Sequence, residues 1–367
     1  MKEINIFKPY LMRAPSYLGG KGMNEVTTKA DKIYKLSSNE NALGMSPKAL
    51  QAVQDSTKNL HIYPDRTGER LQDALSDFYD NELSPAHFVP TNSGSETIEF
   101  IARAFLKEGT EAIICNPSFI PCKMFSDWNG AKVVDIPLKG ENFDLDVAGI
   151  LNAINENTRL VFLTSPNNPT GTYIPKAVIE DLIERVPSHV IIVFDEVYYH
   201  FADAADFTTA LPFVKAGKQV IAVNSFSKTY GLAALRIGYA YSTPEIANYL
   251  RCFYRPFLIN IIGLNAGIAA LSDTEFINEI VDLVQRERAR FYPVFEELNI
   301  TYWKSQGNFV LFRPNIDPTV LIDRLLEDAG VMVRSAAGFG SPDCVRVTIG
   351  TTEANDAFFK GLRAILG

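Results

Sequence analysis

Six short apolar runs, each five or six residues long, recur through the middle of the chain and are separated by segments of helical character. They are residues 111–115, 131–136, 159–164, 189–194, 219–224 and 237–241. Their nearly continuous apolar character is typical of strands that are buried on both faces of a parallel or mixed sheet. The alternation of such strands with helices predicts an α/β fold in which helices cover the sheet.

The pattern changes after Pro256. Apolar positions there recur at spacings of mostly three and four between Ile277 and Leu298, which predicts one long amphipathic helix. Short strands and helices follow to the end of the chain, as in a small α+β unit. The first 40 residues have no clear periodicity. We therefore expect an N-terminal arm that packs with the small domain, a large α/β domain and a small α+β domain, over residues 1–40, 41–255 and 256–367.

Composition and charge exclude several classes of protein. The chain has 367 residues, 47% hydrophobic and 21% charged, with a formal net charge of −8. An acidic chain does not offer the clustered Lys and Arg that nucleic-acid phosphates require. No run of 18 apolar residues is present, so we expect no membrane partner. The opening MKEINIFKPY carries charges and a proline where a signal peptide needs an apolar core.

The four cysteines are spaced unlike a metal site. They are Cys115, Cys122, Cys252 and Cys344, with no CxxC pair and no histidine cluster beside them. Reduced thiols in a cytoplasmic protein are therefore expected, and no metal is expected.

Polar residues follow three of the predicted strands directly. Asn168 follows residues 159–164, Asp195 and Tyr198 follow residues 189–194, and Lys228 follows residues 219–224. Ligands of open α/β sheets bind beyond the carboxyl ends of the strands, so we expect these side chains to meet.

Each of these residues also has a simpler interpretation. Asn168 lies in SPNNPTG, where Asn, Pro and Gly are common turn residues. Asp195 could cap a helix, or could bind a metal in a nucleotide hydrolase. The hydrolase requires a GxxxxGK[ST] loop, whose glycine positions before Lys228 hold Ala222 and Ser227. That reading is set aside.

Two further groups of residues could bind an anion. SGSE, residues 93–96, opens a predicted helix whose backbone N–H groups can bind an anion, and Ser93 with Glu96 also fits a capping box. Ser225, Ser227 and Arg236 surround Lys228 in sequence and can hold a phosphate dianion.

Lys228 stands among small and apolar residues. A desolvated lysine has a depressed pKa and can attack an aldehyde, although an isolated lysine is more often a snorkelling surface residue. A phosphate cradle, a partner for a ring nitrogen, a partner for a phenolate and an amine are together what pyridoxal phosphate requires.

The motifs SFSKTYGLAALRIGY, SPNNPTG, FDEVYYHF, LSSNENALG and VRVTIGT resemble those of the class I/II aminotransferases of fold type I. The resemblance covers nearly the whole chain and is strongest to the histidinol-phosphate aminotransferase branch. It implies a large domain with a mostly parallel seven-stranded sheet, a smaller α+β domain, pyridoxal phosphate as cofactor and a homodimer with shared active sites.

The resemblance also implies roles for individual residues. Lys228 resembles the lysine that holds the cofactor and moves the proton, Asp195 the partner of the ring nitrogen, and Asn168 and Tyr198 the donors to the phenolic oxygen. The remaining cofactor contacts that it implies are Ser95, Glu96, Ser225, Ser227 and Arg236 around the phosphate, Phe119 on the ring, and Tyr63 reaching the neighbouring subunit's phosphate. A core position is the simpler interpretation of Phe119.

On the substrate side the resemblance implies Arg346, Arg334, Tyr17 and Asn39, with Arg346 holding an anionic group. A surface salt bridge is the alternative for Arg334. The chain departs from the branch's usual pattern at GSET, at Phe119 and at PFLIN, and the last of these concerns the substrate pocket.

The expected reaction is transamination between histidinol phosphate and 2-oxoglutarate, a step of histidine biosynthesis. Three alternatives stay open: an aromatic or broad-specificity aminotransferase, a pyridoxal-phosphate lyase acting on a phosphorylated amino acid, and a fold that has lost catalysis and only binds a partner.

Overall fold

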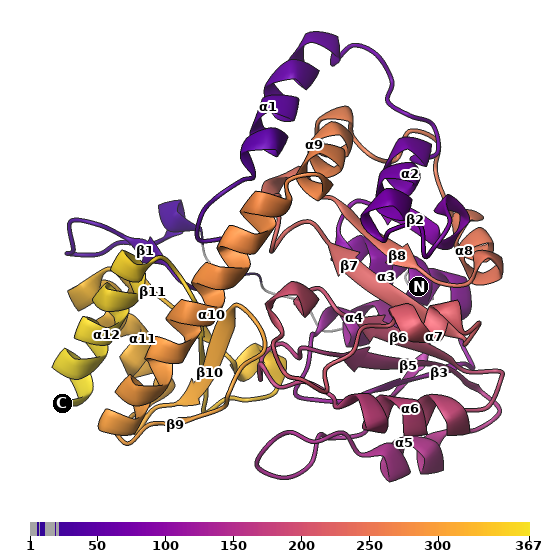
Figure 1. Cartoon of the computed structure of the whole chain (residues 1–367). Coiled ribbons are helices and arrows are strands. Elements are labelled where there is room, and N and C mark those ends of the chain that lie inside the picture. The colour runs from indigo at the N-terminus through magenta and orange to yellow at the C-terminus, as the bar shows by residue number, and fades with distance from the viewer. Residues whose placement is uncertain (1–5, 7, 12–18, 20–21) are drawn as a thin grey trace, which may run out of the picture.

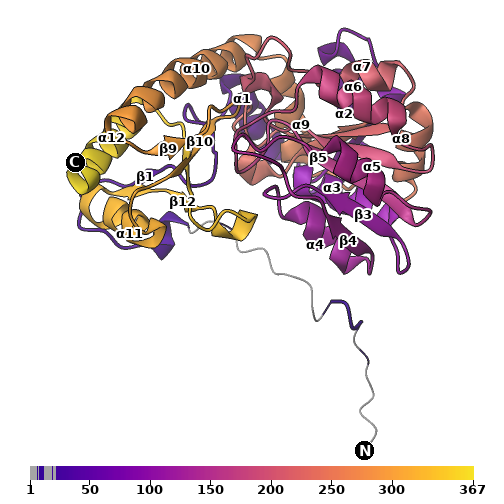
Figure 2. The same ribbon diagram turned by 90° about the horizontal axis from the view of Figure 1, so that it is seen from below.

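The computed structural model describes residues 6, 8–11, 19 and 22–367, and the chain forms two lobes that lie side by side (Figures 1 and 2). The helices are α1 (Pro47–Ser56), α2 (Glu69–Phe78), α3 (Gly94–Phe105), α4 (Pro121–Trp128), α5 (Val147–Ala153), α6 (Lys176–Arg185), α7 (Leu211–Lys215), α8 (Pro244–Arg251), α9 (Ile261–Leu271), α10 (Thr274–Glu297), α11 (Pro318–Ala329) and α12 (Thr352–Leu366). The strands are β1 (Tyr34–Lys35), β2 (Phe88–Thr91), β3 (Glu111–Ile114), β4 (Lys132–Asp135), β5 (Thr158–Thr164), β6 (Ile191–Asp195), β7 (Val220–Ser225), β8 (Gly238–Tyr241), β9 (Thr301–Tyr302), β10 (Phe309–Arg313), β11 (Val331–Met332), β12 (Arg334–Ser335) and β13 (Val345–Thr348).

Local sequence signals explain where several helices begin. Thr243, Asn260 and Asp317 each accept a hydrogen bond from a backbone N–H of the helix that follows. Pro244 and Pro318 occupy the first helical position, where a missing N–H costs nothing. These caps fix the starts of α8, α9 and α11 at the observed residues.

The large sheet confirms the predicted fold class. Its strand order is β2-β8-β7-β6-β5-β3-β4, and β8 runs antiparallel to both of its neighbours while the other pairs are parallel. Each of the six apolar runs overlaps one of these strands. The seventh strand, β2, was not predicted, because its sequence FVPT contains Pro90. Proline is tolerated there since β2 lies at the edge of the sheet.

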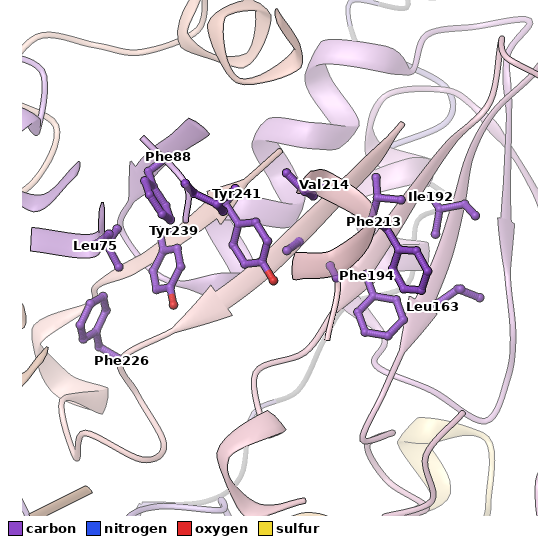
Figure 3. Close-up of a cluster of buried hydrophobic side chains, with 14 of the residues drawn as sticks. Leu75, Phe88, Leu163, Ile192, Phe194, Phe213, Val214, Phe226, Tyr239 and Tyr241 are labelled. Carbon is purple, nitrogen blue, oxygen red and sulfur yellow. The ribbon is translucent and has the colours of Figure 1, made fainter. Parts of the chain in front are cut away.

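Helices cover both faces of this sheet. On one face, Val161 and Phe194 pack with residues of α2, α6 and α9, and Figure 3 shows part of this cluster. On the other face, Leu160 and Val193 pack with residues of α3, α4 and α8. Neighbouring residues of one strand therefore enter opposite cores, which explains the continuous apolar runs in the sequence.

The small lobe has its own core, rich in phenylalanine. The antiparallel sheet β12-β13-β10-β9 packs against α10, α11 and α12. Phe295 and Phe312 stack within this core with ring centroids 4.9 Å apart. The N-terminal segment joins the small lobe through β1, which pairs in parallel with β11.

The hydrophobic core changes inside α10, not after residue 255. Helix α9 packs on α1 and α2 of the large lobe, and Ile277 at the start of α10 still belongs to that core. Ile280, one turn later, belongs to the small-lobe core. The sequence of α9, IIGLNAGIAAL, is apolar on nearly all sides, as expected of a helix that is buried. The change of hydrophobic core thus falls at residues 277–280, about two dozen residues after the division expected from the sequence at 255/256. No helix in the described part of the chain is both long and apolar enough to cross a bilayer.

Candidate active site

A pocket of about 250 Å³ lies where the carboxyl ends of the large-sheet strands meet the small lobe. It is lined by Ser37, Ser38, Asn39, Glu40, Ser93, Gly94, Ser95, Phe119, Asn168, Asp195, Val197, Tyr198, Ser225, Ser227, Lys228, Ala233, Arg236, Arg334 and Arg346. Most of the residues singled out from the sequence are therefore gathered at one site.

The parallel strands account for the large-lobe wall. Asn168 follows β5, Asp195 ends β6, and Lys228 follows β7. These strands are direct neighbours in the order β7-β6-β5, so the residues that follow them reach the same edge of the sheet.

Asp195 and Glu196 point to opposite sides of the sheet edge. Asp195 lines the pocket, whereas Glu196 accepts hydrogen bonds from Tyr241 Oη (2.6 Å), Asn224 Nδ2 (2.9 Å) and the backbone N–H of Ala210 (2.7 Å) on the other side. Successive side chains of β6 point to opposite faces of the sheet, and Asp195 and Glu196 continue this alternation at the end of the strand. Only Asp195 of this pair faces the site.

Burial, and to a lesser extent the neighbouring Glu196, raise the pKa of Asp195 to about 7, against the opposing effects of the Val197 N–H and of Lys228. A cationic group placed beside Asp195 would recover the ionised form, because an opposite charge offsets the cost of desolvation. The site is therefore suited to a protonated ring nitrogen.

The N-terminal segment holds the side chain of Lys228 on the same large-lobe wall. Its Nζ donates to the carbonyl of Ser38 (2.9 Å) and lies 6.0 Å from the ring centroid of Tyr198. Burial, with a smaller contribution from Arg346, lowers the pKa of Lys228 to about 7. A substantial fraction of the amine is thus neutral near pH 7, as a nucleophile or base must be.

The anion cradle forms where α3 begins. Ser93 has φ 106° and Gly94 starts the helix, so the first N–H groups of α3 face the pocket. Gly238 permits this placement, because a Cβ there would lie 2.4 Å from the carbonyl carbon of Ser93. Ser225 and Ser227 join the cradle from β7, with their Oγ atoms 3.0 Å apart.

Three of the eight non-glycine residues with positive φ in the described part of the chain lie at this site. Asn39, Ser93 and Arg236 all line the pocket and have positive φ values of 55°, 106° and 53°. Such conformations cost on the order of 1–3 kcal/mol each, and they persist where the surrounding structure enforces them. The strained backbone supports the placement of a ligand here.

A hydrogen-bond network fixes the orientation of Asn168. Arg346 Nη1 donates to Asn168 Oδ1 (2.5 Å), and a guanidinium has no acceptor, so the amide NH₂ of Asn168 must point away from Arg346. Asn39 Nδ2 in turn donates to the Tyr198 hydroxyl (3.0 Å). Asn168 and Tyr198 are therefore each oriented by a neighbour as potential donors to a ligand oxygen.

The small-lobe wall carries two arginines opposite each other. Arg334 on β12 and Arg346 on β13 are direct cross-strand partners. Both guanidinium groups also lie over the Phe339 ring, at 5.9 and 5.2 Å from its centroid. Like charges directly opposite each other on a sheet are destabilising, which points to an anionic ligand as the reason for the pair.

Two of the predicted residues that the structure describes, Glu96 and Tyr63, do not line the pocket. The Glu96 N–H donates to Ser93 Oγ (3.3 Å), but its carboxylate accepts from the N–H of Asn92 (2.5 Å), one residue before the cap, so only the Ser93 half of the predicted capping box is formed. Tyr63 is 78% exposed and stacks on Phe257, outside the pocket. Tyr17 lies outside the described residues.

The sequence interpretation also missed residues that line the site, namely Ser37, Ser38, Glu40, Val197 and Ala233. The buried Ser37 hydroxyl has no hydrogen-bond partner within the described part of the chain. Ser37, Ser38 and Glu40 belong to LSSNENALG, the motif from which Asn39 was selected. Their contact with the lysine loop could not be inferred, because Ser38 and Lys228 are 190 positions apart.

The chemistry of these groups fits pyridoxal phosphate. The α3 N-terminus with Ser225, Ser227 and Arg236 suits its phosphate, Asp195 its ring nitrogen, Asn168 and Tyr198 its phenolic oxygen, and Lys228 its aldehyde. Phe119 lies in the same pocket, where an aromatic side chain can contact the ring. The fold and the site together define a pyridoxal-phosphate enzyme of fold type I.

Comparison with known proteins identifies the family. Residues 31–362 match the model of the family described as aminotransferase class I and II, so the chain belongs to this family, which depends on pyridoxal phosphate. A histidinol-phosphate aminotransferase of Akkermansia muciniphila is 36% identical over 362 residues, which cover 97% of this chain and 98% of the relative. A histidinol-phosphate aminotransferase of Geobacillus sp. (strain WCH70) is 35% identical over 361 residues, 98% of each chain.

Solved structures agree with this assignment. The histidinol-phosphate aminotransferase of Clostridium acetobutylicum superposes with a TM-score of 0.82 at 26% identity, covering 91% of this chain and 99% of the other. The enzyme of Sinorhizobium meliloti, in complex with pyridoxal-5'-phosphate, has the same fold, with a TM-score of 0.85, 23% identity and 99% coverage of both chains.

Proposed function

We propose that the protein transfers the amino group of histidinol phosphate to 2-oxoglutarate. The observation that carries this proposal is the cross-strand pair Arg334 and Arg346 at the pocket. Two guanidinium groups can hold the dianionic phosphate of such a donor, and they equally suit the carboxylates of the oxo acid. The relatives named histidinol-phosphate aminotransferases support the same donor.

Pyridoxal phosphate, when bound, supplies an aldehyde and an electron-withdrawing ring. The first N–H groups of α3, with Ser225, Ser227 and Arg236, would hold its phosphate. Asp195 would stabilise a protonated ring nitrogen. Asn168 would donate one amide hydrogen to the phenolic oxygen, while its own oxygen remains bound to Arg346.

Lys228 moves the proton. With a pKa of about 7, its Nζ can take a proton from the amine-bearing carbon of the donor and return one near neutral pH. The Ser38 carbonyl, 2.9 Å away, orients this amine. Because the oxo product leaves before the second substrate enters, ping-pong kinetics are expected.

The proposal includes a homodimer. Leu60, Ile62, Tyr63 and Phe257 form an exposed apolar patch beside α9, with Leu60 and Ile62 at 54% and 58% exposure. A second copy of the chain that covers this patch would remove it from water, and Tyr63 would then contribute to the partner's site. All four cysteines are free thiols, which fits a reducing compartment, and we place the enzyme in the cytoplasm.

The test loads the protein with pyridoxal phosphate and supplies histidinol phosphate, histidinol, phenylalanine or threonine phosphate, each with and without 2-oxoglutarate. Glutamate formation from histidinol phosphate, with much weaker conversion of histidinol, is the expected result. Preferred conversion of phenylalanine would replace the proposal with an aromatic aminotransferase. Release of carbon dioxide without an oxo acid would replace it with a lyase.

A further inference from the structure

Gln306, in the turn before β10, connects the small lobe to two separate loops of the active site. Its Oε1 accepts hydrogen bonds from the backbone N–H groups of Asp203 (2.7 Å) and Ala204 (3.0 Å). Its backbone N–H donates to the carbonyl of Gly171 (2.7 Å). We call these three hydrogen bonds the Gln306 clasp.

Both loops carry residues of the pocket. Gly171 closes the turn that begins at Asn167, through its N–H to the Asn167 carbonyl (2.7 Å), and this turn contains Asn168. Asp203 and Ala204 follow the 3₁₀ turn Tyr199–Phe201, which starts directly after Tyr198. The clasp therefore joins the chain that leads into β10 to the two segments that hold Asn168 and Tyr198.

Arg288 of α10 strengthens the same junction from within. It is 3% exposed, and its guanidinium donates to Asp203 Oδ2 (2.7 Å) and to the carbonyls of Phe201 (3.0 Å) and Gly307 (3.3 Å). One buried cation thus binds the loop after Tyr198 and the turn that contains Gln306.

Glycine at position 171 allows the close approach that the clasp requires. Gly171 has φ 77°, and a Cβ there would lie 2.5 Å from Ser305 Oγ and 3.1 Å from Ser305 Cα. A side chain at position 171 would separate the turn that contains Asn168 from the turn that contains Gln306. The contact between these two turns therefore depends on close approach of their backbones.

We propose that Gln306 is a positioning residue that sets the separation between the arginines of the small lobe and the cofactor-facing groups of the large lobe. Arg346 lies on β13, which pairs with β10 directly after the clasp, and Arg346 reaches Asn168 across the same junction. This inference rests on the transamination proposed above. It requires that anionic substrates meet Arg346 but does not depend on which donor is physiological.

The test is a series at position 306 in the full-length protein loaded with pyridoxal phosphate, assayed with whichever amino donor it converts and that donor's oxo acid. Gln306→Leu removes the oxygen that accepts from the Asp203 and Ala204 N–H groups, so the two lobes can shift relative to each other. A displacement of reacting groups by about 1 Å can lower rates by up to about 100-fold. We expect KM for both substrates to rise about 10-fold, with cofactor affinity within about 2-fold of the parent and kcat less affected than KM.

Gln306→Glu is the matched control, because it retains an oxygen that accepts from both N–H groups, and it should restore both KM values. Gln306→Asn, which is shorter by one methylene, should give an intermediate KM and serves if Gln306→Leu does not fold. Hydrogen exchange of the Asp203 and Ala204 amides should quicken in the order Glu, Asn, Leu.

The proposal is overturned if Gln306→Leu, or Gln306→Asn in its place, keeps both KM values while these amides exchange faster. It is equally overturned if the Glu variant fails to restore KM, or if cofactor affinity falls together with KM. Failure of histidinol phosphate as a donor would change only the proposed function, because the series is read with any donor that reacts.

Discussion

The two walls of the pocket differ in how their polar groups are positioned. On the large lobe, Asn168, Asp195 and Lys228 follow three neighbouring strands and meet because the strands are parallel. On the small lobe, Arg334 and Arg346 meet because two antiparallel strands place them in register. The first wall depends on one sheet, whereas the second also depends on how the lobes dock, which is the role assigned to Gln306.

This difference predicts separable effects. Changes on the large-lobe wall should impair cofactor chemistry with every substrate. Changes on the small-lobe wall should impair the binding of anionic substrates and leave the cofactor in place. The following predictions test that separation, beginning with the largest expected effect.

Replacement of Lys228 by Ala should lower turnover by at least about 10⁴-fold, since the variant loses its general base as well as its covalent anchor. The visible absorbance change on addition of pyridoxal phosphate should also be lost. Single-turnover kinetics and absorbance spectra measure both effects. Lys218→Ala, at an exposed lysine on the same lobe, is the matched control and should behave as the parent. Turnover by Lys228→Ala at a near-parental rate would remove Lys228 from the site.

Replacement of Asp195 by Asn should lower kcat about 10²- to 10³-fold with every donor, because a buried cationic ring nitrogen would lose its ionic partner. Glu196→Gln is the neighbouring control. Its side chain lies on the other side of the sheet edge, bonded to Tyr241 and Asn224, so it should lower Tm while the cofactor's absorbance stays unchanged. An equal loss of kcat in both variants would contradict the opposite orientation of the two carboxylates.

Replacement of Arg334 by Gln should reduce kcat/KM for a phosphorylated donor about 10- to 100-fold, the range for loss of charge-assisted hydrogen bonds. The affinity for pyridoxal phosphate should not change. Arg324→Gln, at an exposed arginine on α11, is the control. Steady-state kinetics with phosphorylated and unphosphorylated donors measure the effect, and an equal loss for both donors would argue that Arg334 does not contact the phosphate.

The two walls also differ in how much of them the sequence could predict. The meeting of Asn168, Asp195 and Lys228 could be predicted, because apolar runs show where the strands end and parallel strands align those ends. The role of Ser38 could not be predicted, since its contact with Lys228 depends on tertiary packing of the N-terminal segment. Pro90 concealed β2, because a proline argues against a strand unless its edge position is known.

Other differences have equally local causes. Glu96 matched a family position, yet its N–H bonds to the Ser93 cap and its carboxylate to the Asn92 N–H. Tyr63 cannot be placed at a site by one chain, since its predicted contact is in a partner subunit. The change of core fell in α10 and not at Pro256, because α9 is apolar enough to be buried by the large lobe.

The smallest predicted effect connects the two walls. Capture of pyridoxal phosphate requires the neutral amine of Lys228, so the capture rate should rise with pH and level off above a midpoint near 7, whereas a lysine with the usual pKa near 10.5 would show no plateau in this range. Asp195, whose pKa is raised to about 7, titrates in the same window. Stopped-flow absorbance at a series of pH values gives the midpoint.

The position of that midpoint should depend on the small lobe. Arg346 is a cation that lowers the pKa of Lys228 in addition to the effect of burial. Removing this charge in Arg346→Gln makes the protonated amine less unfavourable, so the folded-state pKa rises and the capture midpoint moves to higher pH. A midpoint that stays fixed in Arg346→Gln would mean that the walls act independently, with burial alone setting the pKa of Lys228.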